Sequence, residues 1–197
     1  MDKWPDTYAV FDIETDGLST KTCLPTELAT MLVIDGMTVD FYETLIWRSR
    51  EQTIHPRITD ITGITNEMCH LEGIPIARAM NRFWAVIQHF PLIGHNIGKF
   101  DIPIIDRFRP PWCLPARVGA DTADLFRVYK LAGVVRWPTD EEFARMHRSN
   151  SEGFKFNLGV ACAEFGVIQN VGKHRGMVDT EYTRQLYMNM RKARIDP

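Results

Sequence analysis

Residues 8–17, with the sequence YAVFDIETDG, carry the clearest strand pattern in the chain and its most informative acids. Successive side chains of a strand point to opposite faces, so Asp12 and Glu14 share one face. The Asp16-Gly17 dipeptide that follows is a turn signal and ends the strand. Two carboxylates this close repel each other unless a cation or hydrogen-bond donors compensate. The pattern therefore indicates either a divalent-metal site or a solvent-exposed strand edge.

The rest of the chain predicts a sheet covered by helices. Two more strands are expected at 27–34 and 38–47, joined at the hairpin dipeptide Asp35-Gly36. A short apolar run at 92–94 predicts a further strand. Apolar spacing, helix-capping residues and helix-stopping prolines predict helices over 76–90, 102–108, 121–131, 157–165 and 179–194. Three initial strands followed by helices alternating with short strands indicate an α/β or α+β fold.

Two other stretches place carboxylates next to expected helix starts. Asp101 lies in GHNIGKFDIP, residues 94–103, and Asp179 ends KHRGMVD, residues 173–179. Each aspartate is interpreted either as a helix N-cap or as part of a metal site. His174, in the loop before the last helix, is either a surface residue or a general base, because histidine exchanges protons near neutral pH.

Composition bounds the class of protein. A chain of 197 residues with 45% hydrophobic content predicts a single domain, 1–197, in which 134–153 forms a surface insertion. The net charge of −2 argues against a protein that coats nucleic acid with a basic stripe. The four cysteines include no C-x-x-C pair and are expected to be reduced core residues. No secretion signal or membrane-spanning run is recognised, so a cytoplasmic location is expected.

Together, FDIETDGL, GHNIGKFDIP and HRGMVD resemble, in order and spacing, the three motifs of the DnaQ-like DEDDh exonucleases of the ribonuclease H-like superfamily. The match covers nearly the whole chain, since IHPRITDITGIT, DTADLFR and NLGVACAEFGV resemble intermediate stretches of the same family. A tyrosine subgroup is disfavoured because Arg175 occupies its position. One departure is the three residues between Asn96 and Phe100, a spacing more like that of the proofreading domains of family B polymerases.

The resemblance implies a ribonuclease H-like α/β fold, with a mixed five-stranded sheet of three antiparallel strands and then parallel ones, flanked by helices. It also implies two Mg²⁺ or Mn²⁺ ions per active site. Asp12, Glu14 and Asp179 would ligate one ion, Asp12 would bridge to the second, and Asp101 would support the second through water. His174 would act as the general base in two-metal-ion hydrolysis. His95 is given no catalytic role, because a histidine beside a strand end more often hydrogen-bonds to the backbone.

The implied activity is 3′–5′ exonucleolytic release of nucleoside monophosphates, with single-stranded DNA as the expected substrate. Thr15 and Asn96 are candidates to hold the end nucleotide, and Leu18 and Ile64 are candidates to contact the terminal bases, unless they are core residues. The alternatives are a proofreading subunit of a separate polymerase, an RNA-trimming enzyme and a non-catalytic nucleic-acid-binding module. The last of these predicts missing carboxylates, yet all five catalytic positions are filled.

Overall fold

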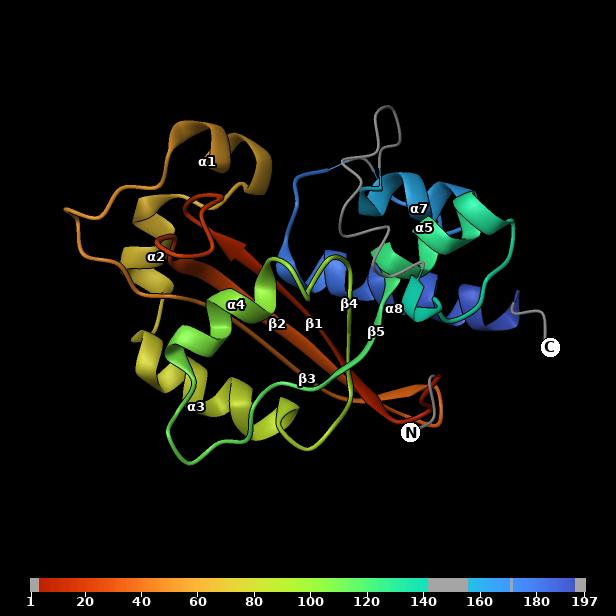
Figure 1. Ribbon diagram of the computed structural model, residues 1–197. Coiled ribbons are helices and arrows are strands. Elements are labelled where there is room, and N and C mark those ends of the chain that lie inside the picture. Colours follow the sequence, from red (N-terminus) through yellow and green to blue (C-terminus); the bar gives the residue numbers. More distant parts are fainter. Residues whose placement is uncertain (1–3, 142–155, 171, 194–197) are drawn as a thin grey trace.

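The protein forms a five-stranded sheet with helices on both faces (Figure 1). The computed structural model describes residues 4–141, 156–170 and 172–193. The strands are β1 Tyr8–Thr15, β2 Pro25–Ile34, β3 Met37–Leu45, β4 Leu92–Gly94 and β5 Val118–Asp121. The helices are α1 Pro56–Thr62, α2 Asn66–Glu72, α3 Ile76–Ile87, α4 Asp101–Ile105, the 3₁₀ turn η1 Asp106–Phe108, α5 Thr122–Ala132, α7 Leu158–Glu164 and α8 Gly176–Lys192.

The strand order is β3-β2-β1-β4-β5. β2 pairs antiparallel with both β1 and β3, and β4 runs parallel to β1 and to β5. The expected mixed sheet of three antiparallel strands followed by parallel ones is therefore confirmed. Asp35 and Gly36 both have positive φ, 51° and 79°, as a tight two-residue hairpin turn requires.

Alternation along β1 divides the core into two layers. Ala9, Phe11 and Ile13 face a cluster that includes Phe83 and Trp84 of α3. The residues between them face the opposite layer, which is built mainly from α5, α7 and α8. Asp12 and Glu14 follow Tyr8 and Val10 on this second face, so the strand directs both acids toward α8.

Several sequence expectations need correction. The region between β3 and α3, for which no helix was predicted, contains α1 and α2, which start at side-chain caps provided by His55 and Thr65. The resemblance implied a fifth strand, but its position was not predicted, because the four residues of β5 are too few for a periodic signal. α3 ends at Ile87 rather than at residue 90, and α8 begins three residues earlier than Asp179.

The expected insertion at 134–153 is only partly described. Val135 is buried and Trp137 packs against the second core layer, so these two residues contribute to the core, whereas residues 139–141 are exposed. Positions 142–153 lie outside the described residues. All four cysteines are buried with free thiols, in agreement with their expected role as core residues. Within the described part, no helix combines the length and apolar character that crossing a bilayer requires.

Candidate active site

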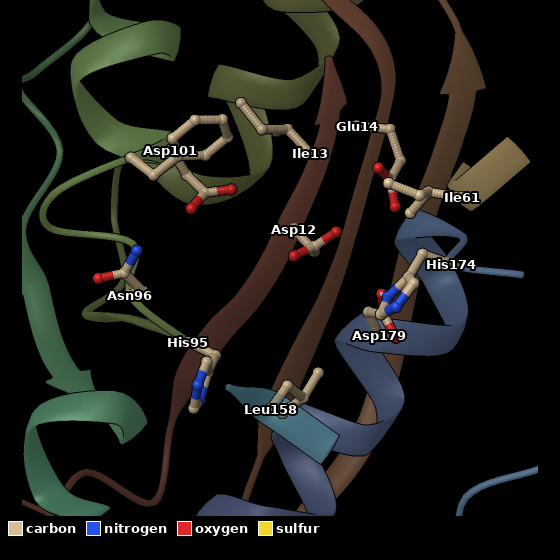
Figure 2. Close-up of a pocket in the computed structure, with 11 residues that line it drawn as sticks. Asp12, Ile13, Glu14, Ile61, His95, Asn96, Asp101, Leu158, His174 and Asp179 are labelled. Atoms are coloured by element: carbon tan, nitrogen blue, oxygen red, sulfur yellow. The ribbon is translucent and has the colours of Figure 1, made fainter. Parts of the chain in front are cut away.

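Four carboxylates line one pocket at the carboxyl end of β1 (Figure 2). Asp12 and Glu14 come from β1 and Asp179 from the first turn of α8, and one carboxylate oxygen from each lies within 4.8 Å of the others. Asp101, from the start of α4, is buried and lines the same pocket, outside this tight group. The pocket has a volume of about 270 Å³.

The helix starts explain how the two separate aspartates reach the pocket. The N-cap positions belong to Phe100 and Arg175, and neither provides a side-chain cap. Asp101 is the first residue of α4, and Asp179 donates its backbone N–H to the carbonyl of Arg175 inside α8. Neither aspartate therefore occupies the capping position that was the alternative interpretation, and both side chains line the pocket instead.

His174 lies just before α8 and forms part of the same pocket. Its Nδ1 is 2.7 Å from Oδ2 of Asp179, and 59% of its side chain is exposed. Its backbone N–H donates to the carbonyl of Ile61 at 3.0 Å, which ties the loop to α1. The histidine therefore has a fixed backbone and a side chain that solvent can reach.

Burial and mutual repulsion raise the pKa values of the clustered acids. Burial, and then the charges of Asp101, Glu14 and Asp179, hold the pKa of Asp12 well above its usual range. Burial, and then the charges of Asp179 and neighbouring acids, raise the pKa of Glu14 to about 8. Burial raises the pKa of Asp101 to about 7. Without a cation, several of these groups hold protons near neutral pH.

The donor set fits a hard divalent cation. The three clustered donors are carboxylate oxygens, which Mg²⁺ and Mn²⁺ prefer, whereas zinc sites favour histidine and cysteine. A cation between them would relieve the repulsion that raises their pKa values. Asp12, Glu14 and Asp179 are thus the residues of the described chain that could hold such an ion together.

Asp121, an acid outside the pocket lining, holds the loop after β4 in place. Its carboxylate accepts hydrogen bonds from the backbone N–H groups of Asn96, Gly98 and Ala123, at 2.8, 3.2 and 3.0 Å. Asn96 adopts a left-handed conformation with φ 64°, which this pairing stabilises. Asp121 was not among the predicted site residues, although it is the N-cap of α5 and an aspartate directly before a helix is a recognisable cap signal.

His95 has a structural place in the pocket wall. Its Nδ1 is 2.9 Å from Oγ1 of Thr122, and its Nε2 is 2.8 Å from the carbonyl oxygen of Phe156. Burial lowers its pKa to about 4, so the ring is neutral at physiological pH. The expectation of a backbone hydrogen bond is confirmed.

The candidate substrate contacts are distributed unevenly. Asn96 lines the pocket. Leu18 is 80% exposed in the turn after β1, so it is not a core residue, but it does not line the pocket. Thr15 is buried and donates its hydroxyl to the carbonyl of Gly17 at 2.6 Å. Ile64 is fully buried in a small cluster with Leu45, Ile54 and Cys69, so it is a core residue.

Three apolar side chains that were not among the predicted site residues line the pocket instead. Ile61 of α1, Phe100 and Leu158 of α7 all line it. Ile61 is 52% exposed. Ile61 lies in the last turn of α1, whereas Ile64 follows the left-handed C-cap Gly63, beyond the end of the helix.

This chain is similar to known exonucleases and to DNA polymerases of the PolC type. A family model described as an exonuclease, RNase_T, matches residues 9–107, about half of the chain. The DNA polymerase III PolC-type protein of Staphylococcus saprophyticus is 26% identical over 186 residues, and that of Halalkalibacterium halodurans is 30% identical over 188. In both cases the match covers 94% of this chain and 11% of the relative, so the chain spans about a tenth of the length of these relatives.

Solved structures with a similar fold include E. coli exonuclease I in complex with a dA16 oligonucleotide, with a TM-score of 0.73 and 18% identity over 96% of this chain and 41% of that chain. Exonuclease I from Methylocaldum szegediense gives a TM-score of 0.71 and 18% identity over 95% of this chain and 41% of that chain. This likeness establishes the ribonuclease H-like fold. Together with the family model, it shows that the chain belongs to the DnaQ-like 3′–5′ exonuclease family.

Proposed function

We propose that this chain is a metal-dependent exonuclease domain that removes nucleoside monophosphates from the 3′ ends of single-stranded DNA. The observation that carries the proposal is the single pocket that contains Asp12, Glu14, Asp101 and Asp179 together with His174. These five side chains come from three distant parts of the chain, and the fold places all of them around one pocket (Figure 2). Family membership supports the reaction class.

The acids would hold two divalent cations. Asp12, Glu14 and Asp179, whose oxygens lie within 4.8 Å of one another, would bind the first, and Asp12 and Asp101 would support the second. When bound, such ions stabilise the charge that develops on a phosphodiester and make water more acidic. The role of the protein is to keep four mutually repelling carboxylates in place, and the burial of Asp101 and Asp179 supports that rigidity.

His174 would accept the proton from the attacking water. Its Nδ1 is engaged with Asp179, which leaves Nε2 as the proton acceptor and orients the ring. Because most of the imidazole is exposed, substrate and water can reach it. A general base typically contributes about 10²- to 10⁴-fold to the rate.

The end nucleotide would lie against the apolar part of the pocket wall. Ile61, Phe100 and Leu158 line the pocket together with the carboxylates, and apolar side chains of this kind accommodate bases without reading their identity. Asn96 would offer its amide to the sugar or phosphate. Leu18, exposed beside the end of β1, would contact the next base.

The reaction class can be tested with 5′-labelled single-stranded DNA. Mg²⁺ should support a ladder that shortens one nucleotide at a time from the 3′ end, and EDTA should stop it. Fragments cut within the strand would contradict the proposal. His174→Ala should slow turnover about 10²- to 10⁴-fold while Mn²⁺ binding remains. A parallel series on duplex DNA, mismatched 3′ ends and RNA would separate DNA degradation from RNA trimming.

A second candidate is proofreading in association with a polymerase. The observation that favours it is the likeness to PolC-type polymerases, of which this chain spans 11%. This candidate predicts preferential removal of a mismatched 3′ nucleotide from duplex DNA. It also predicts that a polymerase co-purifies with the tagged chain from its native cells. Equal rates of removal from matched and mismatched 3′ ends, together with the absence of a co-purifying polymerase, would contradict the proofreading role and favour an enzyme that acts alone.

A further inference from the structure

Glu27 is a fully buried acid beside the active site for which the proposed mechanism has no use. It lies on β2 directly opposite Glu14 in the antiparallel pairing, so both side chains project from the same face of the sheet. The side chain of Glu27 is 0% exposed. Without a partner, its carboxylate would add a fifth negative charge to the four acids of the pocket, and burying that charge would be unfavourable. The partner is Arg175, the residue that follows His174.

The pairing between Glu27 and Arg175 is bidentate. Oε1 accepts from Nη2 of the guanidinium at 2.6 Å, and Nε lies 3.1 and 3.2 Å from the two carboxylate oxygens. Oε2 also accepts the backbone N–H of Gly176 at 2.7 Å. One carboxylate therefore binds both the N-cap residue and the first residue of α8. A bidentate arginine contact fixes orientation as well as distance.

The close approach of the start of α8 to side chains of β2 supports the same attachment. A Cβ atom at Gly176 would lie 2.9 Å from Cβ of Ala29 and 3.3 Å from Oε2 of Glu27. Ala29 is the β2 partner of Asp12. The start of α8 thus lies directly on the part of the sheet that carries the metal-binding acids, and glycine is the residue that permits this approach.

The consequence concerns the two catalytic side chains on either side of this attachment. His174 precedes Arg175, and Asp179 lies in the first turn of α8, three residues after Gly176. The backbone of His174 is held on its other side by the carbonyl of Ile61. The loop is therefore fixed at two points, and the Glu27 contacts determine where α8 begins relative to Asp12 and Glu14.

We propose that Glu27 is a positioning residue, which acts through Arg175 and the Gly176 N–H to place His174 and Asp179 against the acids of β1. This inference rests on the proposed function, because it assigns Glu27 a role in the same site. A buried ion pair is a weak source of net stability, since desolvation offsets the attraction, but its directional contacts specify one arrangement. The pair therefore affects the geometry of the site more than the free energy of unfolding.

The test compares Glu27→Gln with a matched control, Glu181→Gln. The glutamine keeps the size of Glu27, but it removes the charge and turns an N–H group toward the donors of Arg175 or Gly176. Glu181 pairs with Arg184 farther along α8, so its replacement removes a carboxylate–guanidinium pair from the same helix without touching β2. Both variants are measured for kcat, KM and Mn²⁺ affinity on protein that circular dichroism shows to be folded.

Glu27→Gln should lower kcat and Mn²⁺ affinity by about 10- to 100-fold, the size expected when a group that orients metal ligands is lost. KM should change little, and Glu181→Gln should match the wild type. Arg175→Lys keeps the charge but not the bidentate geometry, so it should fall between the two. Because the two residues act as one unit, Glu27→Gln/Arg175→Lys should be no worse than Glu27→Gln alone.

Wild-type kcat and Mn²⁺ affinity in Glu27→Gln, with only a lowered Tm, would show a purely structural role and overturn the inference. If Glu27→Gln does not fold, the milder Arg175→Lys decides by the same two readouts. If the wild type cleaves no nucleic acid, the proposed function fails. Mn²⁺ affinity and amide hydrogen exchange at 174–179 then still test the positioning role, because neither depends on turnover.

Discussion

Raising the pH in the absence of divalent cations should destabilise the folded protein because of the acidic pocket. The folded state holds the pKa of Glu14 at about 8 and that of Asp101 at about 7, and the pKa of Asp12 is also raised. Unfolding returns these groups to ordinary values near 4. Between pH 4 and pH 8 the folded state therefore binds more protons than the unfolded state, and stability falls as pH rises through this window.

The magnitude follows from the number of protons retained. If the folded state holds one more proton than the unfolded state, the free energy of unfolding falls by about 1.4 kcal/mol for each unit by which the pH rises. For a chain of this size that corresponds to a fall in Tm of about 3–6 °C per pH unit. Saturating Mg²⁺ should offset the loss, and its stabilising effect should grow with pH because the cation competes with protons for the same oxygens.

The assay is thermal unfolding from pH 5.5 to pH 8.5, in EDTA and in Mg²⁺, for the wild type and Glu14→Gln. Glutamine cannot titrate, so the variant should show a smaller slope in EDTA and a weaker response to Mg²⁺. The comparison also subtracts surface histidines and carboxylates, which titrate equally in both proteins. A slope in EDTA that is the same for both proteins would refute the electrostatic account of the pocket.

Three further predictions test the placement of individual residues. Gly176→Ala should lower the free energy of unfolding by about 1–3 kcal/mol because the added methyl group overpacks against β2, although alanine is normally the better helix former. Unfolding in urea measures this change, and a variant more stable than the wild type would contradict the close approach of α8 to β2. Leu18→Ser should raise KM and change the free energy of unfolding by no more than about 0.5 kcal/mol. Ile64→Ala should lower the free energy of unfolding by about 2–5 kcal/mol and leave the KM of the folded protein unchanged. The reverse pattern would exchange the roles of the two residues. Asp121→Asn should cost about 1–3 kcal/mol and slow turnover, because one backbone N–H in the loop after β4 loses its acceptor; unchanged unfolding and kinetics would show that the loop holds without it.

Much of the sheet could be predicted from local patterns. The alternation along β1 indicated which face carries Asp12 and Glu14, and the hairpin dipeptide between β2 and β3 fixed their pairing. The short elements α1, α2 and β5 were not predicted, because they contain too few residues to show a hydrophobic period. The capping residues His55 and Thr65 were the only local signal for α1 and α2.

The sequence predicted which acids lie together in the pocket, but it did not predict the residues that hold them there. The carboxylates occur in recognisable order along the chain, whereas Glu27 and Asp121 act through partners that only the tertiary fold brings near. Glu27 meets Arg175 across 148 positions in sequence, and no spacing rule connects them. Ile61 lines the pocket and Ile64, two residues beyond the end of α1, lies in a buried cluster, and the local sequence does not distinguish these two positions.

The most direct test of the central claim is the turnover of Asp12→Asn on a 5′-labelled single strand at saturating Mg²⁺. Asparagine keeps the shape of Asp12 but removes the charge that the cluster would share between two cations. The account predicts that stepwise loss of 3′ nucleotides disappears while the variant stays folded by circular dichroism. Wild-type turnover in folded Asp12→Asn would contradict the assignment of this pocket as the active site.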